Sequence, residues 1–151
     1  MKTLLNSNDR QEILARLARI RPDSQRRWGK MSAPQMVCHL GDSFRGPMGE
    51  KTLSLASWFG RTATKWFALY VPFPWPHGVK TRPEMDQQIA GTPPGDFDSD
   101  VRELRRLMDR FTRHPRNFEW HPHPVFGAMS DKDWQRWGYL HMDHHLRQFG
   151  A

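Results

Sequence analysis

The C-terminal run YLHMDHHLRQF, residues 139–149, constrains the fold more than any other part of the chain. It holds three of the chain's eight histidines. His141 and His145 stand four residues apart, so they share one face of a helix. At about 100° per residue, three further side chains fall on or near that face: Trp134, Trp137 and Gln148. Two imidazoles that turn inward beside tryptophans require either hydrogen-bond partners or a metal ion.

Length and cysteine content limit the class of protein. A chain of 151 residues is expected to fold as a single domain over residues 1–151 around one hydrophobic core. The only cysteine, Cys38, excludes an intramolecular disulfide and is typical of a reducing compartment. The N-terminal apolar run is too short for a signal peptide, and no window approaches the roughly 18 apolar residues of a membrane span. We therefore expect a cytoplasmic protein without a membrane partner.

The chain is basic, with a formal net charge of +7 at pH 7. This balance permits acidic partners but is not a nucleic-acid signature by itself. No run of lysine and arginine exceeds the pairs Arg26-Arg27 and Arg105-Arg106, so the arginines are interspersed. The pattern favours a solvated basic surface over a nucleic-acid-binding module, which would need clustered cations and binding that falls steeply with salt.

Four segments have the apolar periodicity and start signals of amphipathic helices: residues 7–21, 32–46, 96–114 and 130–149. The second begins with the sequence SAPQ, which is a capping box with proline in the first turn. Between the segments the chain is mostly polar or proline-rich, and no stretch alternates as a strand does. The sequence therefore predicts an all-α helical bundle.

Three further stretches connect the last three of these predicted helices. Residues 53–70, which include Trp58 and Phe59, predict one or two short helices. The loop 71–84 begins with three prolines at alternate positions, which forbid a helix or a central strand. This loop either covers a pocket or wraps the bundle, and both readings stay open. His121 and His123 alternate with prolines in another extended stretch, which we interpret as a structural loop.

A third histidine is available from a different helix. His39 lies at the edge of the apolar face of the second segment, and metal sites in helical bundles are built from side chains of facing helices. With His141 and His145 it would give three neutral imidazoles with open coordination positions, as in catalytic rather than structural sites. Imidazole ligands suit a divalent ion such as Zn²⁺, Ni²⁺ or Fe²⁺. The opposing hypothesis is that the three histidines are hydrogen-bonded core residues without a metal.

The chain also resembles a known superfamily. Three stretches carry the resemblance: SAPQMVCHL at residues 32–40, HPVFG at 123–127 and HMDHHLRQF at 141–149. They are similar to the DinB/YfiT-like superfamily, and most similar to its uncharacterised branch with an HPxFG turn before an HxxHHxxQF helix. The resemblance implies an up-down-down-up four-helix bundle and a metal site formed by His39, His141 and His145. His144 belongs to the same motif but lies about 60° off the ligand face, either behind the ligands or against another helix.

The resemblance also implies a class of chemistry. Characterised members of the superfamily include thiol S-transferases that use bacillithiol or mycothiol, a maleylpyruvate isomerase and the bundle part of iron-dependent sulfoxide synthases. Their common theme is a metal that activates a thiol or water. The resemblance therefore implies a small-molecule substrate and a low-molecular-weight thiol as candidate cofactor. Relatives in the superfamily often form homodimers.

We therefore expect a metal-dependent enzyme, either a thiol S-transferase or a hydrolase-like protein. The side chains expected in its substrate pocket are Trp134, Trp137, His144 and Gln148, with Trp75 and the loop around Arg82 and Glu84 nearby. The alternative is a non-catalytic metal- or ligand-binding bundle protein related to stress. The sequence lacks the His-Glu-x-x-His of zinc proteases, a serine nucleophile elbow, a phosphate loop and a Rossmann glycine pattern.

Overall fold

Each of the four predicted amphipathic helices forms, and a polar side chain caps the start of each. The computed structural model describes residues 1–54 and 61–151, which hold five α-helices, one 3-10 helix and no strand. Their bounds, in chain order, are α1 (Ser7–Leu17), α2 (Ala33–Arg45), α3 (Arg61–Tyr70), η1 (Pro83–Met85), α4 (Phe97–Thr112) and α5 (Asp131–Gln148). The capping residues of the four predicted helices are Asn6, Ser32, Asp96 and Ser130. The predicted all-α fold is confirmed for these residues, and none of their helices has the length and apolar character of a membrane span.

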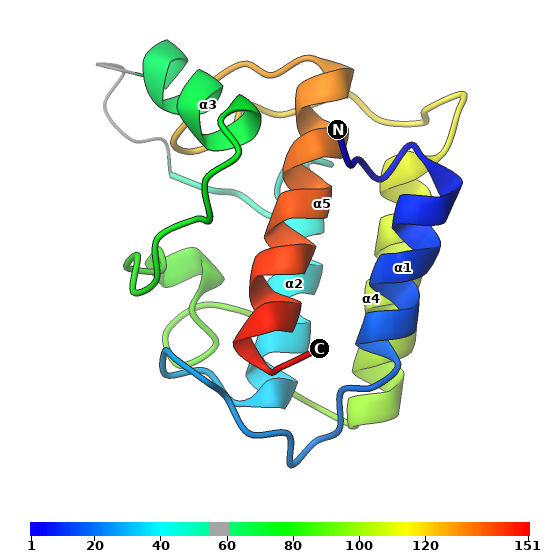
Figure 1. Ribbon diagram of the computed structural model, residues 1–151, viewed down its shortest axis with the longest axis vertical. Helices are drawn as coiled ribbons and strands as arrows, with labels where there is room; N and C mark the ends of the chain where they lie inside the picture. Colours follow the sequence, from blue (N-terminus) through cyan, green and yellow to red (C-terminus); the bar gives the residue numbers. More distant parts are fainter. Residues whose placement is uncertain (55–60) are drawn as a thin grey trace.

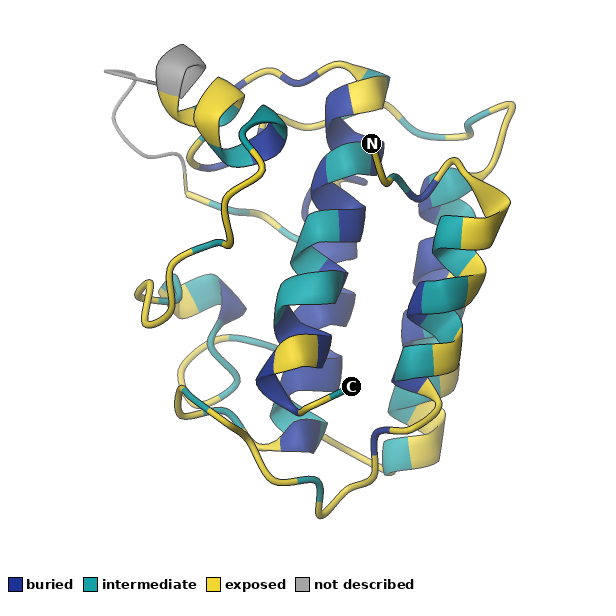
Figure 2. Cartoon of the chain, in the orientation of Figure 1, coloured by how far each residue is buried: buried dark blue, intermediate teal, exposed yellow. Residues whose placement is uncertain are grey.

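The helices α1, α2, α4 and α5 lie side by side and bury a common core (Figure 1). The colours along the ribbons show that α1 and α5 run in one direction, and that α2 and α4 run in the other. The most extensive packing joins α2 to α4 and α1 to α5. Buried residues lie on the inner sides of these helices and exposed residues on their outer sides (Figure 2). The largest fully buried side chains include Phe44, Phe111 and Trp134.

Close packing requires a glycine in the middle of α5. A Cβ atom on Gly138 would come within 2.7 Å of Leu4 Cδ1 and 3.3 Å of Phe111 Cε1. Gly138 stands one turn before His141 on the same helix. The close approach therefore fixes how deeply this part of α5 sits in the bundle, and with it the position of His141.

Helix α3 packs against the first turns of α5. The hydroxyl group of Tyr70 donates a hydrogen bond to Asp133, and Lys65 Nζ lies 3.5 Å from the same carboxylate. One helix of the one or two predicted for residues 53–70 is therefore present. The other part of that prediction, with Trp58 and Phe59, falls on residues 55–60 and lies outside the described residues.

A buried carboxylate attaches the segment after η1 to α2. Asp42 is fully buried and accepts hydrogen bonds from the backbone N–H of Thr92 at 2.8 Å and from the Thr92 hydroxyl at 2.6 Å. Lys51 Nζ lies 3.2 Å from the carboxylate, and Arg45 Nη1 lies 3.3 Å from it. Asp42 stands three residues after His39. The same stretch of α2 therefore carries the candidate ligand His39 and the carboxylate of Asp42, which holds the segment after η1 against this helix.

The substitution Asp42→Ala is expected to lower the free energy of unfolding by about 2–4 kcal/mol, because the partly buried donors of Thr92 lose a fully buried, charged acceptor. The measurement is urea-induced unfolding followed by far-UV circular dichroism. The matched control Asp109→Ala removes an exposed carboxylate from α4, and it is expected to change this free energy by less than about 0.5 kcal/mol. Equal unfolding midpoints for the two variants would show that Asp42 does not anchor the segment.

Candidate metal centre

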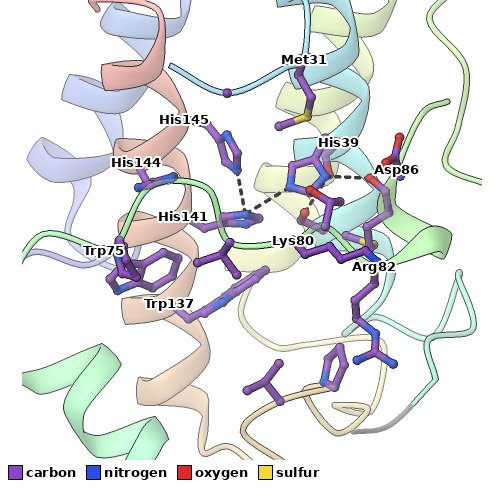
Figure 3. Close-up of a pocket in the computed structure, with 18 of the residues that line it drawn as sticks. Met31, His39, Trp75, Lys80, Arg82, Asp86, Trp137, His141, His144 and His145 are labelled. Atoms are coloured by element: carbon purple, nitrogen blue, oxygen red, sulfur yellow. Dashed lines mark hydrogen bonds between the residues drawn. The ribbon is translucent and has the colours of Figure 1, made fainter. Parts of the chain in front are cut away.

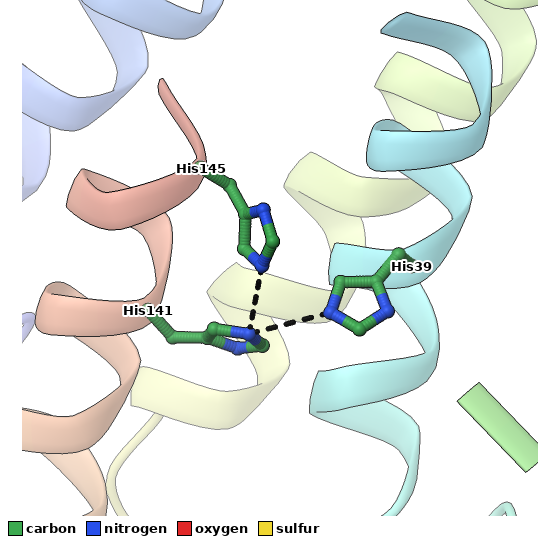
Figure 4. Close-up of side chains that lie close together, drawn as sticks. All are labelled: His39, His141 and His145. Carbon is green, nitrogen blue, oxygen red and sulfur yellow. Dashed lines mark hydrogen bonds between the residues drawn. The ribbon is translucent and has the colours of Figure 1, made fainter. Parts of the chain in front are cut away.

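Three histidines from two helices converge on one point in the bundle. His39 comes from the middle of α2, and His141 and His145 come from successive turns of α5. Figure 4 shows their rings turned toward one another. The Nε2 atom of His141 lies 3.2 Å from Nε2 of His145 and 3.4 Å from Nε2 of His39. One ring nitrogen from each histidine lies within 4.8 Å of those of the other two, so the three side chains could hold one metal ion.

The two nitrogen separations fit ligands of a single ion. Two imidazole nitrogens bound to one ion at about 2.1 Å stand about 3.0 to 3.4 Å apart when the bond angle is about 90° to 109°. The observed distances of 3.2 and 3.4 Å fall within that range. Three protein ligands leave at least one coordination position for water or a substrate, which is the pattern of catalytic rather than structural sites.

Hydrogen bonds on the outer side of two rings assign their tautomers. His39 Nδ1 lies 2.9 Å from the carbonyl oxygen of Met85, the last residue of η1. His145 Nδ1 lies 2.9 Å from Oε1 of Gln148. Both oxygens can only accept, so we assign the hydrogen of each ring to Nδ1. Each Nε2 atom then presents its lone pair to the centre, which is the form that binds a metal.

The side chain of Gln148 is itself held in one orientation. Its Nε2 donates a hydrogen bond of 2.8 Å to the carbonyl oxygen of Trp28, which leaves Oε1 free to accept from His145. Gly29 permits this approach, because its φ is +77° and a Cβ atom there would lie 2.5 Å from Gln148 Nε2. The connector between α1 and α2 thus positions a ligand on α5. Sequence analysis missed the parts played by Trp28 and Met85, because both act through main-chain oxygens that any residue carries.

Burial favours the neutral form of all three rings. It lowers the pKa of His39 from its ordinary value of 6.5, and it lowers the pKa values of His141 and His145 well below that value. The neighbouring imidazoles lower the pKa values of His141 and His145 further, since two protonated rings would repel each other. Protonation is therefore disfavoured where the lone pairs meet, whereas a divalent ion would satisfy all three nitrogens.

The three histidines line a cavity of about 1030 Å³ (Figure 3). Small-molecule sites usually occupy about 300–1,000 Å³, so this cavity is large for the size of the chain. The proline-rich loop forms one wall, from Phe73 to Pro83, and thus covers a pocket. Trp137 packs against His141 with ring centroids 4.8 Å apart, and Trp75 of the loop lies 6.0 Å from the same ring. Aromatic rings therefore flank the cluster where it meets the cavity.

The other residues predicted for the pocket also line this cavity. Trp134 is only 1% exposed and packs mainly in the core, in contact with Phe111 and Trp137. His144 is partly buried beside Trp75, at 6.1 Å between ring centroids, and burial lowers its pKa. Both side chains thus line the cavity, while Trp137 lies directly against the ring of His141.

The histidines of the stretch 121–123 do not join the cluster. His123 Nδ1 accepts hydrogen bonds from the backbone N–H groups of Val125 and Phe126, both at 3.1 Å. The backbone of His123 also pairs with Gly127 in an isolated antiparallel bridge. His121 is exposed. The stretch is a tight turn closed by its own imidazole, in agreement with the predicted structural loop.

Comparison with known proteins identifies one family. The chain matches the family described as Protein of unknown function (DUF1569) over residues 1–151. The match includes α2 and α5, and therefore all three histidines of the cluster. No curated protein and no solved structure matches the chain.

The substitution Gln148→Ala is expected to weaken Zn²⁺ binding about 10- to 100-fold, because His145 loses the acceptor that orients its ring. The measurement is a competition titration against a chromophoric chelator. The matched control is Gln135→Ala, because Gln135 is a buried glutamine of the same helix that donates to the Phe111 carbonyl. The control should lose stability without losing affinity. Equal affinities for Gln148→Ala and the parent protein would show that Gln148 has no part in the centre.

The metal-free protein is expected to lose stability as the pH falls below about 6.5. Five histidines have lowered pKa values, stay neutral in the folded chain and take up protons on unfolding: His39, His123, His141, His144 and His145. The unfolded state then binds more protons, so each histidine contributes up to about 1.4 kcal/mol of lost stability per pH unit.

Urea unfolding of chelator-treated protein at pH 7.5, 6.0 and 5.0 measures this dependence. The variant His141→Ala/His145→Ala removes two of the five groups. Its stability should therefore fall less steeply with acid than that of the parent, and because the carboxylates contribute equally to both proteins, the difference between the two slopes gives the contribution of His141 and His145. Identical slopes would contradict the burial of these two rings as neutral groups.

Proposed function

We propose a metal-dependent catalytic function for this chain, which belongs to the DUF1569 family. In this proposal His39, His141 and His145 bind one divalent ion, Zn²⁺, Ni²⁺ or Fe²⁺, at the wall of the cavity. The reaction is the transfer of a low-molecular-weight thiol to a small-molecule electrophile, or the hydrolysis of a small molecule. A divalent ion supplies Lewis acidity, which lowers the pKa of a thiol or water and makes it a stronger nucleophile.

The convergence of lone pairs carries this proposal. Within the described residues, Nε2 of His39 and Nε2 of His145 each have Nε2 of His141 as their hydrogen-bonding neighbour. His141 can supply one hydrogen at Nε2, and one hydrogen makes one linear hydrogen bond. A buried acceptor without a partner costs about 1–3 kcal/mol. A cation bound by all three nitrogens removes that cost, whereas a purely structural role leaves it in place.

Other groups of the chain would orient the ligands and limit the access of water. The Met85 carbonyl and the Gln148 amide hold the rings of His39 and His145 with Nε2 toward the centre. Trp137 covers part of the His141 ring, and the loop 71–84 forms the outer wall of the cavity. These contacts keep the ligands in place before any substrate enters, which reduces the reorganisation that a reaction would require.

We also propose that the chain has the up-down-down-up four-helix bundle of the DinB/YfiT-like superfamily. Two observations support this relation. The helices α1 and α5 run opposite to α2 and α4 (Figure 1), and the candidate ligands come from α2 and α5, as the motif at residues 32–40 and 141–149 implies. Because thiol transfer occurs in that superfamily, a thiol is the first co-substrate to test.

Protein purified without a metal-affinity tag is expected to carry about one divalent ion per chain by elemental analysis. The variant His141→Ala/His145→Ala is expected to carry almost none, because two of the three ligands are missing. The variant His121→Ala, which removes an exposed histidine, serves as the matched control and should retain the metal. If the parent protein stays empty after incubation with Zn²⁺, Ni²⁺ and Fe²⁺, the proposal fails and the three histidines are structural.

The same samples are then assayed for turnover. Glutathione with 1-chloro-2,4-dinitrobenzene tests thiol transfer, in which a sulfur–carbon bond forms, chloride leaves and the thiol proton passes to solvent. The ester p-nitrophenyl acetate tests hydrolysis. Activity in either assay should fall at least about 100-fold in His141→Ala/His145→Ala. Stoichiometric metal without turnover in these and related assays would favour the alternative function, a non-catalytic metal-binding protein related to stress.

A further inference from the structure

The cavity beside the three histidines carries more positive than negative charge. The charged side chains that line it are Lys30, Lys80, Arg82 and Asp86. Figure 3 shows Lys80 and Arg82 among the side chains that border the cavity near His39. Neither Lys30 nor Lys80 is among the lysines that form ion pairs within the described residues, so neither has a carboxylate partner there. The lone carboxylate, Asp86, is occupied by a hydrogen bond of 2.9 Å from the backbone N–H of Gln88.

Arg82 has an unused hydrogen-bond donor. Its Nη2 donates to Ser54 Oγ at 2.9 Å, but its Nε is buried and has no hydrogen-bond partner in the described part of the chain. Glu84 Oε2 forms an ion pair with Arg82 at 4.0 Å from Nε, which is too far for a hydrogen bond, and this oxygen likewise has no hydrogen-bond partner among the described residues. The other oxygen of Glu84 accepts the backbone N–H of Ser54 at 3.1 Å. A buried guanidinium N–H without an acceptor is costly in a folded protein, and a bound acceptor would remove that cost.

His123 offers a second donor to the same cavity. Its Nδ1 accepts two backbone N–H groups, so its hydrogen is on Nε2. His123 lines the cavity, and within the described residues its Nε2 makes no hydrogen bond. Burial, together with the nearby charge of Arg82, lowers the pKa of His123 to about 3. The ring therefore stays neutral at physiological pH, and its Nε2–H remains a fixed donor close to Arg82.

Apolar side chains surround the cavity on its solvent side. Five large apolar residues that line it are exposed to solvent: Phe67 (58%), Phe73 (72%), Val79 (72%), Ile89 (69%) and Val125 (41%). They come from α3, from the proline-rich loop, from the segment after η1 and from the turn after His123. Exposed apolar residues that continue into a cavity are typical of a ligand-binding surface.

We propose that this cavity binds an organic anion with an apolar body. The guanidinium group of Arg82 and His123 Nε2–H donate to its anionic group, and Lys80 adds positive charge. The apolar body lies against the exposed side chains of the rim. The anionic group is a carboxylate or a phosphate, since a guanidinium group and an N–H donor that line one cavity match the oxygens of either group. That this anion is the substrate of the reaction rests on the proposed function. Binding of the anion itself uses residues outside the three-histidine cluster.

Binding of octanoate and of 1-octanol, followed by tryptophan fluorescence, tests this proposal, because Trp75 and Trp137 line the cavity. Both ligands have the same chain length, and only the first is an anion. Octanoate should bind at least about 10-fold more tightly than 1-octanol. The variants Arg82→Gln and Lys80→Gln should each lose most of that preference without a change in 1-octanol binding. Arg19→Gln removes an exposed arginine of the α1 end and should keep the full preference.

A third ligand, octyl phosphate, distinguishes a site for a phosphate group from a site for a carboxylate group. Tighter binding of octyl phosphate than of octanoate identifies a phosphate group, and the reverse order identifies a carboxylate. Absence of binding, equal binding of octanoate and 1-octanol, or a preference unchanged in both variants overturns the proposal. Each titration is made with metal-loaded and with chelator-treated protein. An anion preference in protein that never binds metal would preserve this inference while the proposed catalytic function fails.

Discussion

The convergence of three imidazole Nε2 atoms, two of them acceptors, is the constraint on which the other parts of the structure depend. His39 and His145 each use Nδ1–H for a hydrogen bond away from the centre, so their Nε2 atoms face His141 as acceptors. Burial disfavours the protonation that could otherwise relieve the conflict. An arrangement of this kind is stable only if the surrounding contacts hold it, and it suits a cation better than any polar group that the chain supplies.

The contacts that hold it come from the connections between helices rather than from the helices themselves. The Met85 carbonyl belongs to η1, and Asp42 anchors the chain just beyond η1 to the helix that carries His39. The Trp28 carbonyl belongs to the α1–α2 connector and orients Gln148. The ring of Trp28 also stacks on His77 of the proline-rich loop, with centroids 3.9 Å apart. The same connector therefore contacts both the proline-rich loop and the glutamine that orients the candidate ligand His145.

The sequence predicted the helices and the proximity of His141 and His145, because both depend on local spacing. Apolar periodicity and capping residues locate a helix, and a separation of four residues brings His141 and His145 to one face. The place of His39 came from its position at the edge of an apolar face and from the superfamily motif. The orientation of the rings was not predictable, because main-chain oxygens of Met85 and Trp28 set it. The spacing of His121 and His123 likewise gave no sign that His123 binds the N–H groups of its own turn.

The ligands of the candidate centre lie far apart in the chain, since His141 comes 102 positions after His39. A site divided in this way cannot exist during synthesis until α5 has left the ribosome and packed against α2. A metal ion that binds all three histidines could therefore be acquired only after α5 has joined the core, and not by a nascent segment.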